Sequence, residues 1–214
     1  MRITVVCPNE APRRPVPGQV VLDTTSHNKE LGKYFSPFHL GPVELYDGFV
    51  SRTMENAWQY AKVYASLLEK DGSVGARYFE WANAGWNSPE AVRHPIRKGA
   101  KPVFSLWAGQ QLDYVTARKE IYVPLYRDAV KASGGYDLLL DMASSAEELV
   151  LVDFDGYPHR KNKMSYADVL NNGKRSMGHA FVLAMMLEYG PKVDAAMVEA
   201  ACGYVVAPEQ PGLF

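Results

Sequence analysis

The segment that most constrains the fold is residues 173–188, because it contains the longest apolar run of the chain, 180–187, and is followed by Gly190-Pro191. A glycine and then a proline after an apolar periodic segment are typical of a helix end. The run is far too short to cross a bilayer. A helix with so little polar surface has to be covered by other elements. We therefore predict a helix over residues 173–188 that packs in the core of a globular protein.

A second helix is predicted over residues 53–70. Thr53 can cap its first turn, where Glu55 interacts favourably with the helix dipole, and Asp71-Gly72 ends the pattern. Apolar and aromatic residues recur along its length, which suggests burial on several sides. We expect this helix in the core as well.

Shorter patterns fill the rest of the chain. Strands are predicted for 3–6, 20–22, 43–46 before the turn Asp47-Gly48, and 149–154 before Asp155-Gly156. Further helices are predicted over 74–84, from Ser88, over 110–132 with a kink or break at Pro124, and over 193–202. Short helical or extended pieces are predicted at 138–142 and 146–150, and a basic loop at 158–164. The strands do not alternate regularly with helices, which excludes a doubly wound sheet. The predicted fold class is α+β, a helix-rich single domain with a few short strands.

The overall charge excludes a protein that is basic throughout. There are 23 Lys and Arg residues against 24 Asp and Glu, and 47% of the 214 residues are hydrophobic, as in globular proteins. Contact with a nucleic acid would therefore need a local patch, for which residues 93–101 and 159–163 are the densest basic stretches. Ordinary solvated loops are the alternative interpretation of both stretches.

Several classes of functional site are missing from the sequence. It has no glycine-rich nucleotide-binding fingerprint and no HExxH or GxSxG motif, and its five histidines lack metal-ligand spacing. Cys7 and Cys202 lack CxxC spacing, which favours two reduced thiols. The N-terminus lacks the apolar stretch of a signal peptide. We expect a cytoplasmic protein that needs no metal or cofactor and has no contact with a membrane.

The most informative local pattern is Glu55, Gln59 and Lys62, at positions i, i+4 and i+7. On a helix this spacing places a carboxylate, an amide and an amine along one stripe, with Trp58 beside it. Many Glu–Lys stripes are simply solvated helix faces, which is the alternative here. The apolar surroundings argue for burial, and a buried Glu and Lys need partners or a chemical role.

Three blocks of the sequence together resemble the NADAR family. They are the loop Tyr34–Phe38 with Gly48 and the pattern Thr53-x-Glu55-x-x-x-Gln59-x-x-Lys62, then Glu148–Val150 with Asp155-Gly156-Tyr157, and finally Gly173–Gly178. Members of that family are N-glycosidases that act on ADP-ribose and riboflavin-precursor compounds, and some remove ADP-ribose from guanine bases. The resemblance covers about residues 33–188 of a domain spanning 1–214, flanked by N-terminal strands and a C-terminal helix and tail.

This chain also departs from the family pattern. Pro37 and Arg175 stand where the family has Asn, and Asp155-Gly156-Tyr157 does not match the Trp-Gly that usually follows the family's late acid. The resemblance therefore implies a divergent member, and it leaves two functions open. One is a hydrolase that cleaves the N-glycosidic bond of a ribosyl-nucleotide or ADP-ribosyl substrate, free or carried on a nucleic acid. The other is a non-catalytic module that binds a nucleotide or modified base.

The resemblance implies three catalytic residues: Glu55, Lys62 and Asp155. Cleavage of an N-glycosidic bond passes through a state with positive charge at the ribose C1′, which carboxylates stabilise. A desolvated Lys62 would attack C1′ or the ring-opened aldehyde as a neutral amine and form a Schiff base, while Glu55 holds the ribose hydroxyls and Asp155 serves as second acid.

A larger set of residues is implied for substrate binding. Trp58, Tyr122 and Tyr157 would stack on a base, and Arg118 and Arg175 would contact a diphosphate. Packing in the core is the alternative for each aromatic residue, and it is favoured for Tyr122. The full predicted set is Ser36, Phe38, Trp58, Gln59, Arg118, Tyr157, Arg175 and Gly178. The aglycone and the oligomeric state stay open.

Overall fold

The computed structural model describes residues 1–204 and contains a parallel sheet at its N-terminal side. The strand order is β1 (Arg2–Val6), β8 (Glu148–Val152), β2 (Gln19–Asp23). Ile3 of β1 and Val20 of β2 both pair with Leu149, so β8 is the central strand although it is late in the sequence. The predicted strands at 3–6 and 20–22 are confirmed, and the one predicted at 149–154 is shifted to end at Val152.

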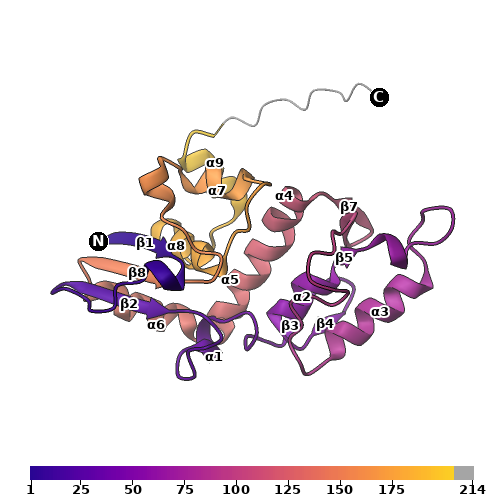
Figure 1. Ribbon diagram of the computed structural model, residues 1–214, viewed down its shortest axis with the longest axis horizontal. Helices are drawn as coiled ribbons and strands as arrows, with labels where there is room; N and C mark the ends of the chain where they lie inside the picture. The colour runs from indigo at the N-terminus through magenta and orange to yellow at the C-terminus, as the bar shows by residue number, and fades with distance from the viewer. Residues whose placement is uncertain (205–214) are drawn as a thin grey trace.

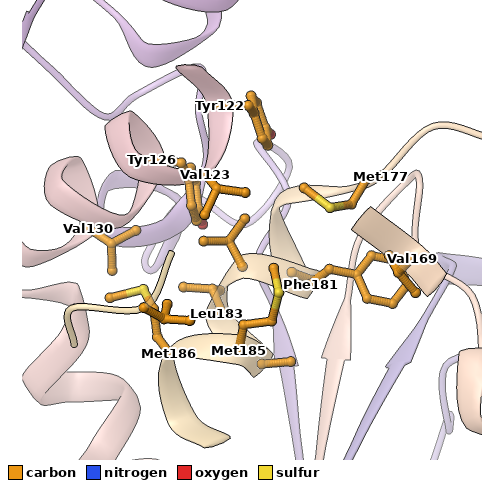
Figure 2. Packing of buried hydrophobic residues seen from close by; sticks show 14 of the residues in the cluster. Tyr122, Val123, Tyr126, Val130, Val169, Met177, Phe181, Leu183, Met185 and Met186 are labelled. Atoms are coloured by element: carbon orange, nitrogen blue, oxygen red, sulfur yellow. The ribbon is translucent and has the colours of Figure 1, made fainter. Parts of the chain in front are cut away.

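The apolar helix is α8 (His179–Tyr189), and it packs against β1 and β8. Residues 180–186 are completely buried, which confirms the predicted core helix. Figure 2 shows its Leu183 and Met186 close to Val130 of α5 (Val123–Ala132). The predicted start at residue 173 is wrong, because 173–178 are not helical. Instead the Asp153 carboxylate accepts the N–H of Ala180 at 2.9 Å and so satisfies the first turn of α8.

The predicted helix over 53–70 is wrong in its length. Helix α2 (Met54–Tyr60) is capped by Thr53 as expected, but the chain then enters β5 (Lys62–Val63) and the 3₁₀ helix η2 (Ala65–Leu67). Strand β5 pairs with β6 (Phe104–Trp107), a strand without an obvious sequence pattern. Pairing with this distant segment outweighs the local helical periodicity.

A second, smaller core lies on the other side of α5 (Figure 1). Here α3 (Ala76–Asn87) packs against α2, close to the predicted helix at 74–84. The predicted turn Asp47-Gly48 joins β3 (Val43–Glu44) to β4 (Val50–Ser51). No helix begins at Ser88, and residues 88–103 contain neither helix nor strand.

The predicted helix over 110–132 is divided among several elements. It starts as β7 (Gln110–Leu112), followed by α4 (Tyr114–Ala117), the π-helical turn η3 (Arg118–Tyr122) and α5. Pro124 lies in the first turn of α5, directly after the π-helical turn, which accommodates the missing N–H. The remaining elements are η1 (Pro8–Glu10), α1 (Gly32–Phe35), α6 (Gly135–Ser144), η4 (His159–Asn162), α7 (Tyr166–Asn171) and α9 (Ala195–Ala201).

These elements confirm a helix-rich α+β fold with short strands. Helix α6 covers the predicted piece at 138–142, whereas the piece at 146–150 leads into β8. The 3₁₀ helix η4 occupies most of the predicted basic loop, and α9 lies within the predicted helix at 193–202. Within residues 1–204 no helix combines the length and apolarity that a bilayer crossing requires. The predicted C-terminal tail, 205–214, lies outside the described residues.

Gly85 of α3 provides a test of the smaller core. A Cβ atom at this position would collide with the ring of Tyr60, which Trp81 holds at a centroid distance of 4.6 Å. Gly85→Ala is expected to lower the free energy of unfolding by about 1–3 kcal/mol, although alanine favours a helix. Thermal unfolding would show this loss, and Glu80→Ala on the exposed face of α3 is the control with little change. A more stable Gly85→Ala variant would contradict this packing.

Candidate functional site

A cavity of about 680 Å³ lies between α2, the segment after β8 and the irregular segment 88–103. It brings together most of the residues predicted from the sequence. The predicted residues that line it are Ser36, Phe38, Glu55, Trp58, Gln59, Lys62, Arg118, Asp155 and Gly178. Tyr157 and Arg175 do not line it.

The predicted polar stripe forms a continuous hydrogen-bonded chain. Lys62 Nζ donates to Gln59 Oε1 at 2.7 Å, and Gln59 Nε2 donates to Glu55 Oε1 at 2.9 Å. Glu55 and Gln59 are buried, at 6% and 8% exposure, so the alternative of a solvated helix face is wrong. Lys62 lies two residues beyond the end of α2, in β5, and its Nζ lies 4.7 Å from the centroid of the Trp58 ring. The stripe therefore spans a helix end and a strand.

Burial changes the acid–base properties of this chain of side chains. Desolvation lowers the pKa of Lys62 to about 8; the negative charge of Glu55 opposes this shift and the positive charge of Arg93 adds to it. Desolvation also raises the pKa of the Glu55 carboxyl, against the opposing effects of Gln59 and Lys62. The neutral amine is therefore a larger fraction of Lys62 near physiological pH than of an exposed lysine.

The loop before α2 forms part of the cavity wall and is hydrogen-bonded to this helix. The Pro37 carbonyl accepts the N–H of Glu55 at 2.9 Å, and Ser36 Oγ accepts the N–H of Phe38 at 3.3 Å. Ser36 is 1% exposed. Since proline lacks only the backbone N–H, its carbonyl can still satisfy the first turn of α2.

The structure adds a buried ion pair that the sequence analysis missed. His179 Nδ1 lies 3.0 Å from Asp153 Oδ2, and its Nε2 lies 2.9 Å from the Thr24 carbonyl oxygen. Nε2 also lies 2.8 Å from Thr24 Oγ1, whose own proton is donated to the Val152 carbonyl oxygen at 2.8 Å. Both ring nitrogens thus face acceptors and are placed to donate, as in an imidazolium. The charge of Asp153 and this hydrogen bonding outweigh burial and raise the pKa of His179, while His179 lowers the pKa of Asp153.

This pair explains the glycine at the start of α8. A Cβ atom on Gly178 would collide with the Asp153 carboxylate, so Gly178 allows the carboxylate to approach the helix end. A signal for the pair exists in the sequence, since Asp153 follows a strand and His179 precedes the apolar run. Nothing in the sequence places these two residues side by side, because they are 26 positions apart.

Asp155, the predicted second acid, lies at the rim of the cavity. Its Oδ2 forms an ion pair of 2.7 Å with Arg93 of the irregular segment, and the two side chains are 35% and 42% exposed. Desolvation still raises the pKa of Asp155, and Arg93 opposes that shift. The ion pair ties the segment 88–103 to the end of β8 across the cavity.

The Arg118 side chain is held by backbone carbonyl oxygens and has a structural role. Its buried guanidinium donates to the carbonyl oxygens of Val169, Leu170, Asn172 and Arg175 at 2.8–3.1 Å and lies over the Tyr114 ring. These bonds satisfy the end of α7 and the following turn. A diphosphate would have to displace them, so the geometry does not support the predicted contact.

Tyr157 and Arg175 contact each other instead of the cavity. The Arg175 guanidinium lies 3.8 Å from the centroid of the Tyr157 ring, and the ring packs against Phe181 of α8. Tyr157 is 2% exposed, so core packing, the alternative interpretation, describes it. Arg175 is exposed at the surface.

Tyr122, for which core packing was the favoured interpretation, lines the cavity as well. Other lining residues had no sequence signal for function, and among them Tyr114, Met177, His27 and Phe154 add apolar and aromatic surface. In residues 1–204 no group of three or more His, Cys, Asp or Glu residues is arranged to hold a metal ion. Cys7 and Cys202 are both free thiols.

Comparison with known proteins gives a family without a known function. No curated protein and no solved structure matches the chain. A family model described as a family of unknown function (DUF6939) matches residues 9–170, a range that contains Glu55, Lys62 and Asp155. The resemblance to the NADAR family stays a prediction. The chain belongs to the DUF6939 family.

Proposed function

We propose that the protein is an N-glycosidase that cleaves the bond between a ribosyl C1′ and a base nitrogen in a nucleotide or ADP-ribosyl substrate. The observation that carries the proposal is the meeting of Lys62, Glu55 and Asp155 around one cavity, with the pKa of Lys62 lowered to about 8. A neutral lysine amine with one buried carboxylate and a second at the rim of the cavity suits attack on a carbon that develops positive charge.

In the proposed reaction the neutral amine of Lys62 attacks C1′, and the electron pair of the C1′–N bond leaves with the base. The proton lost by the attacking nitrogen passes to the departing base. The resulting glycosylamine opens to a Schiff base, and water then adds to C1′ and releases the Lys62 amine. Ionised Glu55 stabilises positive charge at C1′ and accepts hydrogen bonds from ribose hydroxyls.

The cavity also has groups that fit the rest of such a substrate. Arg93, His94 and Arg97 line its mouth and would attract phosphate groups. Trp58 and Phe154 offer aromatic faces for a base. The basic segment 93–101 would also reach the backbone of a nucleic acid that carries the substrate.

A second candidate function is binding without turnover. It is favoured by the position of Lys62 Nζ, which donates to Gln59 and lies over the Trp58 ring as a held cation would. Pro37 and Arg175, at positions where the NADAR family has Asn, favour it as well. In this case Lys62 would hold a phosphate or a ribose oxygen.

The two functions are separated by product analysis. The protein is incubated with an oligonucleotide carrying ADP-ribose on guanine, and separately with free ADP-ribosyl compounds, and the products are identified by mass. Release of free ADP-ribose or its ribosyl fragment supports the glycosidase. Stable binding of these compounds without products supports the binding module. If the protein neither binds these compounds nor releases products, both functions are excluded.

The pH dependence of cleavage is a further prediction. Because the reactive form of Lys62 is the neutral amine, kcat/KM is expected to rise with pH to a plateau, with a midpoint near the lowered pKa of about 8. At lower pH a second loss is expected where Glu55 takes up a proton, above the ordinary value of 4.5. Steady-state kinetics between pH 5 and 10 would measure both limbs. A flat profile through pH 8 would contradict a nucleophilic role for Lys62.

A further inference from the structure

Tyr122 lies in the wall of the cavity and has no role in the proposed reaction. Its side chain lines the cavity and is 7% exposed, at the end of the π-helical turn η3. Among the described residues its hydroxyl makes no hydrogen bond, yet it is not one of the polar atoms that are both unpartnered and fully buried, which are the Tyr46 and Tyr166 hydroxyls and Trp86 Nε1. The hydroxyl is therefore a free hydrogen-bonding group that opens into the cavity.

The position of the Tyr122 ring is well defined. It lies parallel to the ring of Tyr126, at an interplanar angle of 10° and a centroid distance of 6.0 Å, and meets the Trp58 ring edge-on at 5.2 Å. Figure 2 shows Tyr122 at the margin of the apolar cluster, with Tyr126 further inside. Contacts with these two rings restrict the orientation of the Tyr122 ring and so the direction of its hydroxyl.

The two stacked tyrosines differ in what their hydroxyls do. Tyr126 donates to the Phe35 carbonyl oxygen at 2.6 Å, which is an ordinary structural hydrogen bond. Burial, and after it the negative charges of Asp153, Glu55 and Asp155, raise the pKa of Tyr122 well above the ordinary value. Its hydroxyl therefore keeps its proton and can act as a donor at any ordinary pH.

We propose that Tyr122 contacts the substrate and donates a hydrogen bond to a sugar oxygen, and that Tyr122, Glu55 and Asp155 together form a subsite for the vicinal diol of a ribosyl group. Carboxylates accept hydrogen bonds from sugar hydroxyls, and a phenol supplies the complementary donor. A phosphate group would be repelled between these carboxylates, so in this proposal the phosphates lie toward His94 and Arg97. The choice of a ribosyl ligand rests on the proposed function.

The stacked pair supplies a matched test in the intact protein, with binding measured by calorimetry and stability by thermal unfolding. Tyr122→Phe is expected to keep the melting temperature and to weaken binding of ADP-ribose roughly fivefold to tenfold, because only a hydrogen bond to the ligand is lost. Binding of pyrophosphate, which has no sugar, should stay unchanged. Tyr126→Phe is expected to lower the melting temperature and to keep the affinity for ADP-ribose.

The outcomes separate this inference from the cleavage reaction. Equal affinity of Tyr122→Phe and wild type for ADP-ribose would overturn the role of Tyr122 and leave the glycosidase standing. The expected loss of affinity, without any product from wild type, would support the subsite and overturn cleavage. If wild type does not bind ADP-ribose, or if Tyr122→Phe melts as early as Tyr126→Phe, the subsite is overturned.

Discussion

Lys62→Ala is expected to abolish cleavage, with a loss of roughly a thousandfold or more in kcat/KM, because no other residue in the proposed reaction supplies the amine that forms the covalent intermediate. Borohydride, which reduces a Schiff base to a stable amine, should trap wild type on its substrate and increase its mass. Lys62→Ala should show no such adduct. Mass spectrometry of the intact protein and of its peptides would place the adduct on Lys62.

Lys62→Arg distinguishes a nucleophile from a fixed positive charge. A guanidinium keeps the charge but does not become neutral at ordinary pH, so a nucleophilic role predicts a loss nearly as large as in Lys62→Ala. An electrostatic role predicts partial activity in Lys62→Arg and no adduct in wild type. Lys192→Ala, in the exposed turn between α8 and α9, is the control and should keep both activity and trapping, because Lys192 does not line the cavity.

Glu55→Gln tests the carboxylate next to Lys62. The amide has nearly the same shape and can still accept a hydrogen bond from Gln59, so the cavity should persist while turnover slows. The negative charge of Glu55 raises the pKa of Lys62, so in Glu55→Gln the rise of kcat/KM with a midpoint near pH 8 should move to lower pH.

Full activity in Lys62→Ala would exclude both the nucleophilic and the electrostatic role of Lys62.

Asp153→Ala is expected to lower the free energy of unfolding by about 3–5 kcal/mol, the largest loss of stability that we expect from a single substitution. The change removes the partner of a buried imidazolium and the acceptor of the Ala180 N–H at the start of α8. For a chain of this size the melting temperature should fall by roughly 6–20 °C. Asp155→Ala is the control, because its ion pair with Arg93 is exposed and contributes about 0–1 kcal/mol.

The contribution of the Asp153–His179 ion pair to the free energy of unfolding is expected to depend on pH. The pKa of His179 is raised, so its contribution is complete below its ordinary value of 6.5 and is lost as the pH rises through the folded-state pKa. The pKa of Asp153 is lowered, so its contribution is complete above 3.8 and is lost as the pH falls through the folded-state pKa. The stability difference between wild type and the isosteric Asp153→Asn should be largest between these values. A difference that is constant from pH 3 to pH 9 would contradict a buried ion pair.

Part of the site could be predicted from local sequence alone. Glu55 and Gln59 are one helical turn apart, and Thr53 caps the helix that carries them, so local geometry is enough to align them. Lys62 joins the same chain of hydrogen bonds for a different reason, because the backbone changes from helix to strand before it. The prediction was therefore right about which three residues line up, and wrong in placing all three on one helix.

Other parts of the site depend on contacts between distant segments. Arg118 was predicted at a diphosphate because it is a cation on a helix, yet its guanidinium is taken up by carbonyl oxygens about fifty positions later. Asp155 pairs with Arg93 and Asp153 with His179, and neither pairing leaves a local pattern. Such pairs become visible only when the end of β8, the start of α8 and the segment 88–103 are placed together.

The sequence by itself determined the features that depend on short-range periodicity and composition. These are the buried apolar helix α8, the strands β1 and β2, the turn at Asp47-Gly48 and the helix-rich α+β class, because apolar spacing and turn residues act over a few positions. Only the tertiary structure decided where α2 ends and which carboxylates meet at the cavity. Pairing of β5 with β6 and burial of unlike charges involve residues tens of positions apart, and their energies outweigh local helical preference.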